Sequence, residues 1–241
     1  MKRYILTLFI AVFALMQAAA QTYDNLWKQA DIIARKDQPR SEIGVMKKII
    51  SKASAAKDYG QLMAAEMRQM ILWKEISADS LTPNVKRMEA EVLKVKDPAL
   101  KAVRYAVLGK VYSDMDEKKS EEFFKKALQQ PELLAKHTST EYIPLTLKGV
   151  DGSSFNNDLL HLIGFEADSK EAYHLMYTYY NKVGNRGAAC LCAYKLIEKY
   201  RQDDVREVKK SKYLQTIDSL IQVYQDIPEA GELAVEHFRF M

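Results

Sequence analysis

The stretch DPALKAVRYAVLGKVY, residues 97–112, decides the fold class of this chain. Asp97 can cap the first turn of a helix, and Pro98 suits the first helical position, where its missing N–H group costs nothing. Apolar side chains then recur every three or four residues, at Leu100, Val103, Val107 and Val111. The stretch therefore predicts an amphipathic helix with a defined first residue and one buried face.

The residues that follow extend this helix into a hairpin pattern. A tetratricopeptide repeat pairs two antiparallel helices, and the first carries Leu-Gly followed, after two residues, by Tyr. The second helix carries a small residue, an aromatic residue four positions later and Ala three positions after that. The matching residues are Leu108, Gly109, Tyr112, Ser120, Phe124 and Ala127. We therefore expect two helices that approach closely at their small residues, with aromatic rings filling the space beside the contact.

Helical periodicity continues outward from this hairpin in both directions. The expected helices cover residues 23–36 and 39–56, begin at 58 and within 80–83, and lie near 156–164 and 169–183. After a turn at Gly184-Asn185, the cysteine-bearing helix runs to Tyr200, and further helices cover 214–224 and 228–241. The fold class that follows is all-α, with antiparallel helical hairpins stacked as a degenerate tetratricopeptide-like solenoid.

Two segments interrupt the helical pattern. Residues 131–154 contain the sequence EYIPLTLKGVDGSS, whose proline, glycines and β-branched residues lack a helical period and predict a long connection. Residues 201–212 are rich in charge and predict a second, solvated connection. We therefore expect a helical-hairpin region over residues 21–130, a connecting segment over 131–154 and a second helical region over 155–241.

The N-terminus, MKRYILTLFIAVFALMQAAAQ, has the composition of a secretory signal peptide. Lys2 and Arg3 precede an uncharged apolar run from Tyr4 to Met16, and small residues lead to Ala20. The run is too short to span a bilayer comfortably. We expect cleavage after Ala20, export to the periplasm or cell envelope, and no membrane insertion of the mature chain. An uncleaved anchor is the alternative.

The charge balance gives no reason to expect nucleic acid as a partner. The chain has 36 Lys and Arg residues against 32 Asp and Glu, and removal of Lys2 and Arg3 leaves 34 against 32, a net charge of +2. The two signs are interleaved along the chain, without the basic patch that phosphate binding requires.

Cys190 and Cys192 stand one residue apart on an expected helix. At 100° per residue their side chains point about 160° apart, so they cannot form an unstrained disulfide with each other. A zinc site would need two further ligands from elsewhere. We expect two buried, unpaired thiols that pack as small hydrophobes, with metal, redox or partner binding as alternatives.

Catalytic motifs are absent from the sequence. It contains no G-x-S-x-G, H-E-x-x-H, P-loop or G-x-G-x-x-G pattern. The four histidines, none three or four residues from another, are His137, His161, His174 and His237. We therefore expect no catalytic residue, no cofactor and no metal ion. The alternative is an exported enzyme whose site uses scattered residues such as His161, Glu166 and His174.

A tyrosine cluster between residues 173 and 180 is the most unusual local composition. Tyr173, Tyr177 and Tyr180 share one face of the expected helix, whereas Tyr179 falls on the face of Leu175. Tyrosine supplies a large contact area at low entropic cost, so these three residues are our candidates for a partner surface. Core packing of both faces is the alternative.

Several stretches in order along the chain resemble the N-terminal helical region of large exported bacterial alpha-2-macroglobulin-like proteins. The stretches are YDNLW (23–27), DPALKAV (97–103), LGKVY (108–112), KGVDG (148–152), DLL (158–160), IG (163–164), GNR (184–186) and AAC (188–190). The resemblance implies a helical segment ahead of β-sandwich domains, and proteinase trapping in the cell envelope. The Cys-Gly-Glu-Gln thioester, the bait region and the β-domains of that family are missing here, so no trapping residue carries over.

These observations lead to two functional hypotheses. The first is a non-catalytic, exported interaction or scaffold module that forms the N-terminal part of an alpha-2-macroglobulin-like envelope protein, with further domains of a longer chain as its partners. The abrupt end of the last helix at Met241 fits this hypothesis. The second is a free-standing exported adaptor that binds a peptide or an envelope partner in its concave face.

Overall fold

The computed structural model describes residues 22–77, 79, 81–146, 149–203 and 207–240, so the predicted signal peptide lies outside the described residues. Their regular secondary structure is helical, which confirms the predicted all-α class. Within them, no helix is both long enough and apolar enough to cross a membrane. The chain divides into two compact units, Met1–Asn84 and Val85–Met241.

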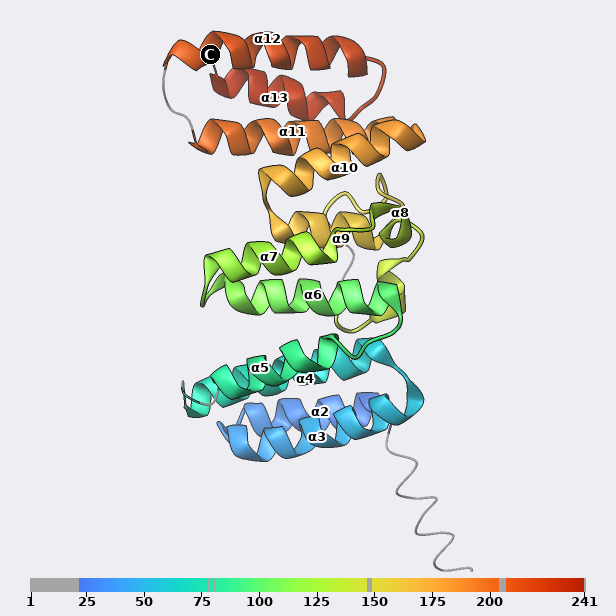
Figure 1. The fold of residues 1–241 in the computed structure, drawn as a ribbon, viewed down its shortest axis with the longest axis vertical. Coiled ribbons are helices and arrows are strands. Elements are labelled where there is room, and N and C mark those ends of the chain that lie inside the picture. Colours follow the sequence, from blue (N-terminus) through green and yellow to red (C-terminus); the bar gives the residue numbers. More distant parts are fainter. Residues whose placement is uncertain (1–21, 78, 80, 147–148, 204–206, 241) are drawn as a thin grey trace, which may run out of the picture. The chain divides into compact units, whose positions relative to one another are not determined.

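The described part of the first unit is helical. Its complete helices are α2 (Tyr23–Ala34), α3 (Pro39–Ala56) and α4 (Tyr59–Ile76) (Figure 1). The third helix begins after Asp58, close to its predicted start, and the Asp58 carboxylate caps it by accepting a hydrogen bond from the backbone N–H of Gln61. The core is aliphatic and contains Leu26, Ala30, Ile43, Val45, Met46, Ile49, Ala65 and Leu72. Helix α5 (Leu81–Val92) begins at the end of this unit and continues into the second.

The hairpin that decides the fold class follows α5 along the chain, in the second unit. Its helices are α6 (Pro98–Ser113), capped by Asp97, and α7 (Glu117–Ala127). A methyl group added at Gly109 would lie 2.8 Å from a ring carbon of Phe124, so only glycine permits this approach. The Ser120 hydroxyl donates a hydrogen bond to the Gly109 carbonyl over 2.8 Å. The predicted small and aromatic positions therefore meet across the hairpin.

The predicted connection at 131–154 is more ordered than its composition indicates. It contains α8 (Pro131–Leu134) and a 3-10 helix, η2 (Ser139–Tyr142). The backbone N–H of Leu159 donates to the carbonyl of His137 over 2.9 Å, and Phe155 is fully buried. Because the segment folds back onto its own unit, it does not separate the compact units, which divide instead between Asn84 and Val85.

The remaining helices complete the second unit. They are α9 (Leu159–Ala167), α10 (Lys170–Val183), α11 (Arg186–Asp203), α12 (Glu207–Tyr224) and α13 (Ala230–Phe240). Helix α11 contacts α10, α12 and α13.

Three predicted boundaries in this region were wrong. The charged connection expected at 201–212 is mostly helical, because its Lys, Glu, Arg and Gln residues are good helix formers and include no Gly or Pro. Helix α9 starts at Leu159, since the Asp158 side chain caps it. The last helix starts at Ala230 and not at Pro228.

Candidate binding groove

The structure separates the three tyrosines that the sequence placed on one face. Tyr173 and Tyr180 are 2% and 1% exposed, and their hydroxyls donate to the carboxylates of Asp168 and Asp158. Only Tyr177 reaches the surface, half-buried. The predicted three-tyrosine surface is therefore corrected to one residue, because the neighbouring elements cover the other two.

Tyr177 lines a groove with a volume of about 630 Å³ that α10, α11 and α12 form together. We call it the tyrosine groove. Its nine lining residues are Tyr177 of α10, Ala193, Leu196, Ile197 and Tyr200 of α11, and Lys212, Tyr213, Thr216 and Leu220 of α12. Most of these side chains are apolar or aromatic, and Lys212 is the single charged residue among them. The groove can accept a few apolar side chains.

One end of the tyrosine groove combines aromatic rings with positive charge. The rings of Tyr200 and Tyr213 lie 6.3 Å apart between centroids. The ammonium group of Lys170 lies 4.6 Å from the centroid of the Tyr200 ring, within the range of a cation–π contact. Tyr200 remains 41% exposed, so its ring is available to a ligand.

At the other end, Tyr177 neighbours a buried tyrosine. The hydroxyl of Tyr224 on α12 donates to the Asn181 side chain on α10 over 3.2 Å. Burial and the adjacent Tyr177 hydroxyl raise the pKa of Tyr224 well above its ordinary value. The two walls of the groove are thus tied together by neutral hydrogen-bonding groups.

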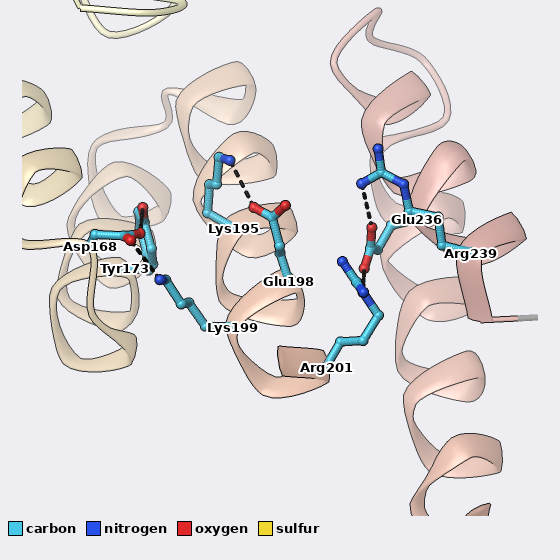
Figure 2. Close-up of polar contacts among 8 residues, drawn as sticks. All are labelled: Asp168, Tyr173, Lys195, Glu198, Lys199, Arg201, Glu236 and Arg239. Atoms are coloured by element: carbon cyan, nitrogen blue, oxygen red, sulfur yellow. Dashed lines mark hydrogen bonds and ion pairs between the residues drawn. The ribbon is translucent and has the colours of Figure 1, made fainter. Parts of the chain in front are cut away.

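Polar contacts on the sides of α11 turned away from the groove hold its floor in place. Figure 2 shows Lys199 of α11 against Asp168, with 2.6 Å between ammonium nitrogen and carboxylate oxygen. The Tyr173 hydroxyl donates to the other oxygen of the same carboxylate over 2.7 Å. Lys195 and Glu198 pair over 2.8 Å along α11. The floor is therefore attached to the α9–α10 corner.

The opposite side of α11 is attached to α13. Glu236 of α13 is completely buried and accepts hydrogen bonds from Arg201 Nε over 2.6 Å and from Arg239 Nη1 over 3.1 Å (Figure 2). Charge-assisted bonds of this kind are roughly twice as strong as neutral ones. Contacts on both sides make the groove floor a fixed surface, which lowers the reorganisation cost of binding.

A second hollow, about 740 Å³ in volume, lies between α7 and the start of α10. Its rim carries charges of both signs, from Lys118, Lys125, Glu121, Glu122 and Glu171. Such a mixed rim indicates no single ligand chemistry. The tyrosine groove is therefore the better candidate for a binding site.

Both cysteine thiols are buried, as the helical spacing predicted, and both are free. Burial raises the pKa of Cys190 to about 12 and that of Cys192 well above its ordinary value. Because the thiolate is the reactive form, neither thiol is activated as a nucleophile at neutral pH.

The scattered residues of the alternative enzymatic hypothesis lie in different environments. His161 is buried and stacks on Phe155 with 4.1 Å between ring centroids, while His174 is exposed. Glu166 pairs with Lys110 over 2.5 Å. The structure does not gather these groups in an open cleft. In the part of the chain that the structure describes, no cluster of three His, Cys, Asp or Glu residues could hold a metal ion.

Sequence reasoning identified Tyr177 but missed Tyr200 and Tyr213. These residues come from three helices, and the start of α12 was expected to be a connection. The available signal was the helical spacing of Tyr213, Thr216 and Leu220, which places them on one face. Comparisons with protein-family models, with characterised proteins and with solved structures found no match.

Proposed function

We propose that this chain is a non-catalytic, exported helical module that binds a segment of a partner protein in the tyrosine groove. The observation that carries the proposal is the groove itself, with exposed aromatic rings over an apolar floor that is fixed from behind. Tyrosine anchors supply much of the binding energy of protein interfaces.

The chemistry of the second unit supports binding and not catalysis. Its cysteines are protonated at neutral pH, and burial lowers the pKa of His161 to about 4, so that buried imidazole stays neutral. The residues that line the groove include no histidine, cysteine or carboxylate. A general acid, base or nucleophile would have to come from outside it.

A random peptide library displayed on phage tests the proposal. The library is panned on the wild-type chain and on Thr216→Trp, which fills the groove from the exposed rim of α12. Gln215→Trp adds the same side chain at the neighbouring exposed position outside the groove. We expect peptides that bind wild type and Gln215→Trp but bind Thr216→Trp at least about tenfold more weakly, a difference of about 1.4 kcal/mol.

A library that yields no peptide, or peptides that bind all three proteins equally, would contradict the proposal. Circular dichroism and thermal melting of each variant provide the folding control. Thr216 and Gln215 are both exposed, so neither substitution disturbs the core.

The signal-peptide composition of residues 1–20 supports an exported location for this module, and the proposed place in an alpha-2-macroglobulin-like envelope protein agrees with it. Two observations test these points. Mature protein recovered from the periplasm should begin at Gln21 by N-terminal sequencing, and recovery of the full-length chain in the cytoplasm would contradict export. β-sandwich domains encoded directly downstream would support the scaffold role in such a protein. Unrelated genes there would favour the free-standing adaptor.

A further inference from the structure

We infer that the tyrosine groove selects acidic protein segments, in which carboxylate side chains stand next to aliphatic or aromatic ones. This inference rests on the proposed function and adds the chemistry of the partner. It is carried by the distribution of charge around α11, which differs between the groove and the sides of the helix turned away from it.

The groove presents a cation without a compensating acid. Lys212 is exposed at the rim, and it makes no ion pair with any residue that the structure describes. None of the nine lining residues is acidic. A partner that fills the apolar floor would bring its own side chains against this ammonium group, which is then partly removed from water.

A second cation lies at the aromatic end of the groove. The Lys170 ammonium group sits over the Tyr200 ring, whose neighbour Tyr213 lines the groove directly after Lys212 in the sequence. A carboxylate bound near the Tyr200 ring would therefore be close to the Lys170 ammonium group. A lysine or arginine of the partner at the same place would be repelled.

The cations on the other sides of α11 are already neutralised. Lys199 pairs with Asp168, Lys195 with Glu198, and Arg201 with Glu236 (Figure 2). Among the residues that line the groove, Lys212 of α12 is the charged one, and it has no acidic counterpart among the described residues. Charge complementarity selects an acidic partner there, and the apolar floor selects aliphatic or aromatic anchors.

Binding of three matched peptides tests the inference. Fluorescein-labelled peptides share the apolar frame LFXXLFXXL, with Glu, Gln or Lys at every X, and anisotropy titrations measure their dissociation constants at low ionic strength. We expect the Glu peptide to bind about tenfold more tightly than the Gln peptide, and the Lys peptide to bind most weakly. Added salt should reduce this preference.

Charge reversal at the rim provides the matched control. Lys212→Glu should reverse the order, so that the Lys peptide binds more tightly than the Glu peptide. Lys48→Glu changes the net charge equally at an exposed lysine of α3 and should preserve the wild-type order. Thr216→Trp should weaken all three peptides.

The possible outcomes separate the inference from the proposed function. Equal binding of the Glu and Gln peptides, or the same loss of preference in Lys48→Glu as in Lys212→Glu, would overturn the inference. If Thr216→Trp abolishes the binding of the Glu and Gln peptides that is seen with wild type, the proposed function stands. Library peptides that depend on the groove but lack acidic residues would likewise overturn only the inference. If none of the three peptides binds wild type, the inference is overturned, and the library decides the proposed function by itself.

Discussion

Two corners of the second unit bury a carboxylate in different ways. At the α11–α13 corner Glu236 is completely buried between the guanidinium groups of Arg201 and Arg239. At the start of α9 Asp158 is 3% exposed, and its donors are neutral: the Tyr180 hydroxyl at 2.9 and 3.0 Å and the His161 backbone N–H at 2.8 Å. One carboxylate is neutralised by full charges, and the other is stabilised by dipoles alone.

The Asp158 carboxyl has a raised pKa because its donors are neutral and it is buried. Burial raises the pKa of its carboxyl from an ordinary value of 3.8 to about 6, and the hydrogen bonds from His161 and Tyr180 offset only part of that increase. The buried His161 ring lies in the same corner, and its nitrogens make no hydrogen bond of normal geometry with a described residue. Neutral hydrogen-bond donors therefore hold the buried Asp158 carboxylate in place without keeping its pKa low.

Breaking the ion pair at the α11–α13 corner should have the largest effect. Arg201→Met leaves Glu236 buried with a single guanidinium partner and should lower the free energy of unfolding by about 3 kcal/mol. Glu236→Met removes the buried charge and leaves two partly exposed arginines that water can solvate, so its cost should stay below about 1 kcal/mol. Urea unfolding measures both variants, and equal losses would contradict the assignment of the cost to the buried carboxylate.

The pH dependence of stability should reveal two opposing groups at the Asp158 corner. The pKa of Asp158 is raised in the folded state, so its contribution is complete below pH 3.8 and is lost as the pH rises through about 6. Burial lowers the pKa of His161 from 6.5 to about 4, so its contribution is complete above pH 6.5 and is lost as the pH falls through about 4. Each of these two contributions to the free energy of unfolding amounts to about 3 kcal/mol. Because they change in opposite directions with pH, they nearly cancel in the wild-type protein.

Variants at these two positions separate the contributions. Asp158→Asn should lose about 3 kcal/mol of stability between pH 6.5 and pH 4, relative to the wild-type change over that range, because only His161 still titrates. His161→Leu should gain a similar amount on the same acidification. Urea unfolding across this range measures both slopes, and wild-type slopes in both variants would refute the assignment.

Removing the neutral donor at this corner should have a smaller effect. Tyr180→Phe keeps the ring, which meets Phe155 edge-on, but removes the hydroxyl from both Asp158 oxygens. At pH 7.5, where Asp158 is ionised, the loss should be about 2 kcal/mol. At pH 5 it should be smaller, since the protonated carboxyl accepts a weaker bond. A loss that does not vary with pH would mean that the hydroxyl does not act on the charged form.

The exposed pair on the side of α11 should matter least. Lys199→Met removes the ammonium group from Asp168, whose side chain is about half exposed, and should change stability by less than about 0.5 kcal/mol. The Tyr173 hydroxyl still donates to Asp168 in this variant. A loss of several kcal/mol in thermal melting would show that exposure does not separate weak ion pairs from strong ones in this unit.

Local sequence signals predicted the helices whose boundaries depend on their own residues. Pro39–Ala56 was predicted with its exact bounds, Asp97 caps α6 as expected, and α10 begins one residue after the predicted start at Ser169. The error at 201–212 arose because charge was interpreted as solvated connection, whereas Lys, Glu and Arg are also strong helix formers. Composition alone does not distinguish these two outcomes.

The candidate site was predicted only in part, because periodicity identifies a face without identifying what covers it. One helical face carries Tyr173, Tyr177 and Tyr180. The hydroxyl of Tyr173 donates to Asp168 and that of Tyr180 donates to Asp158, so only Tyr177 stays accessible. Tyr200 and Tyr213 join it because α11 contacts both α10 and α12, and the three helices line one groove. Contacts between residues of different helices do not produce a periodic pattern in the sequence, so periodicity cannot predict them.

The sequence by itself determined the all-α class, the closely packed α6–α7 hairpin and the burial of both cysteines. Each of these follows from propensity and spacing within one or two helices, where 3.6 residues per turn relate position to face. Tertiary structure alone decided which tyrosine faces solvent, which lysine of the groove lacks an acid, and which buried carboxylate has a cation beside it. Those properties depend on the distance between side chains of different helices, which packing sets and no local pattern encodes.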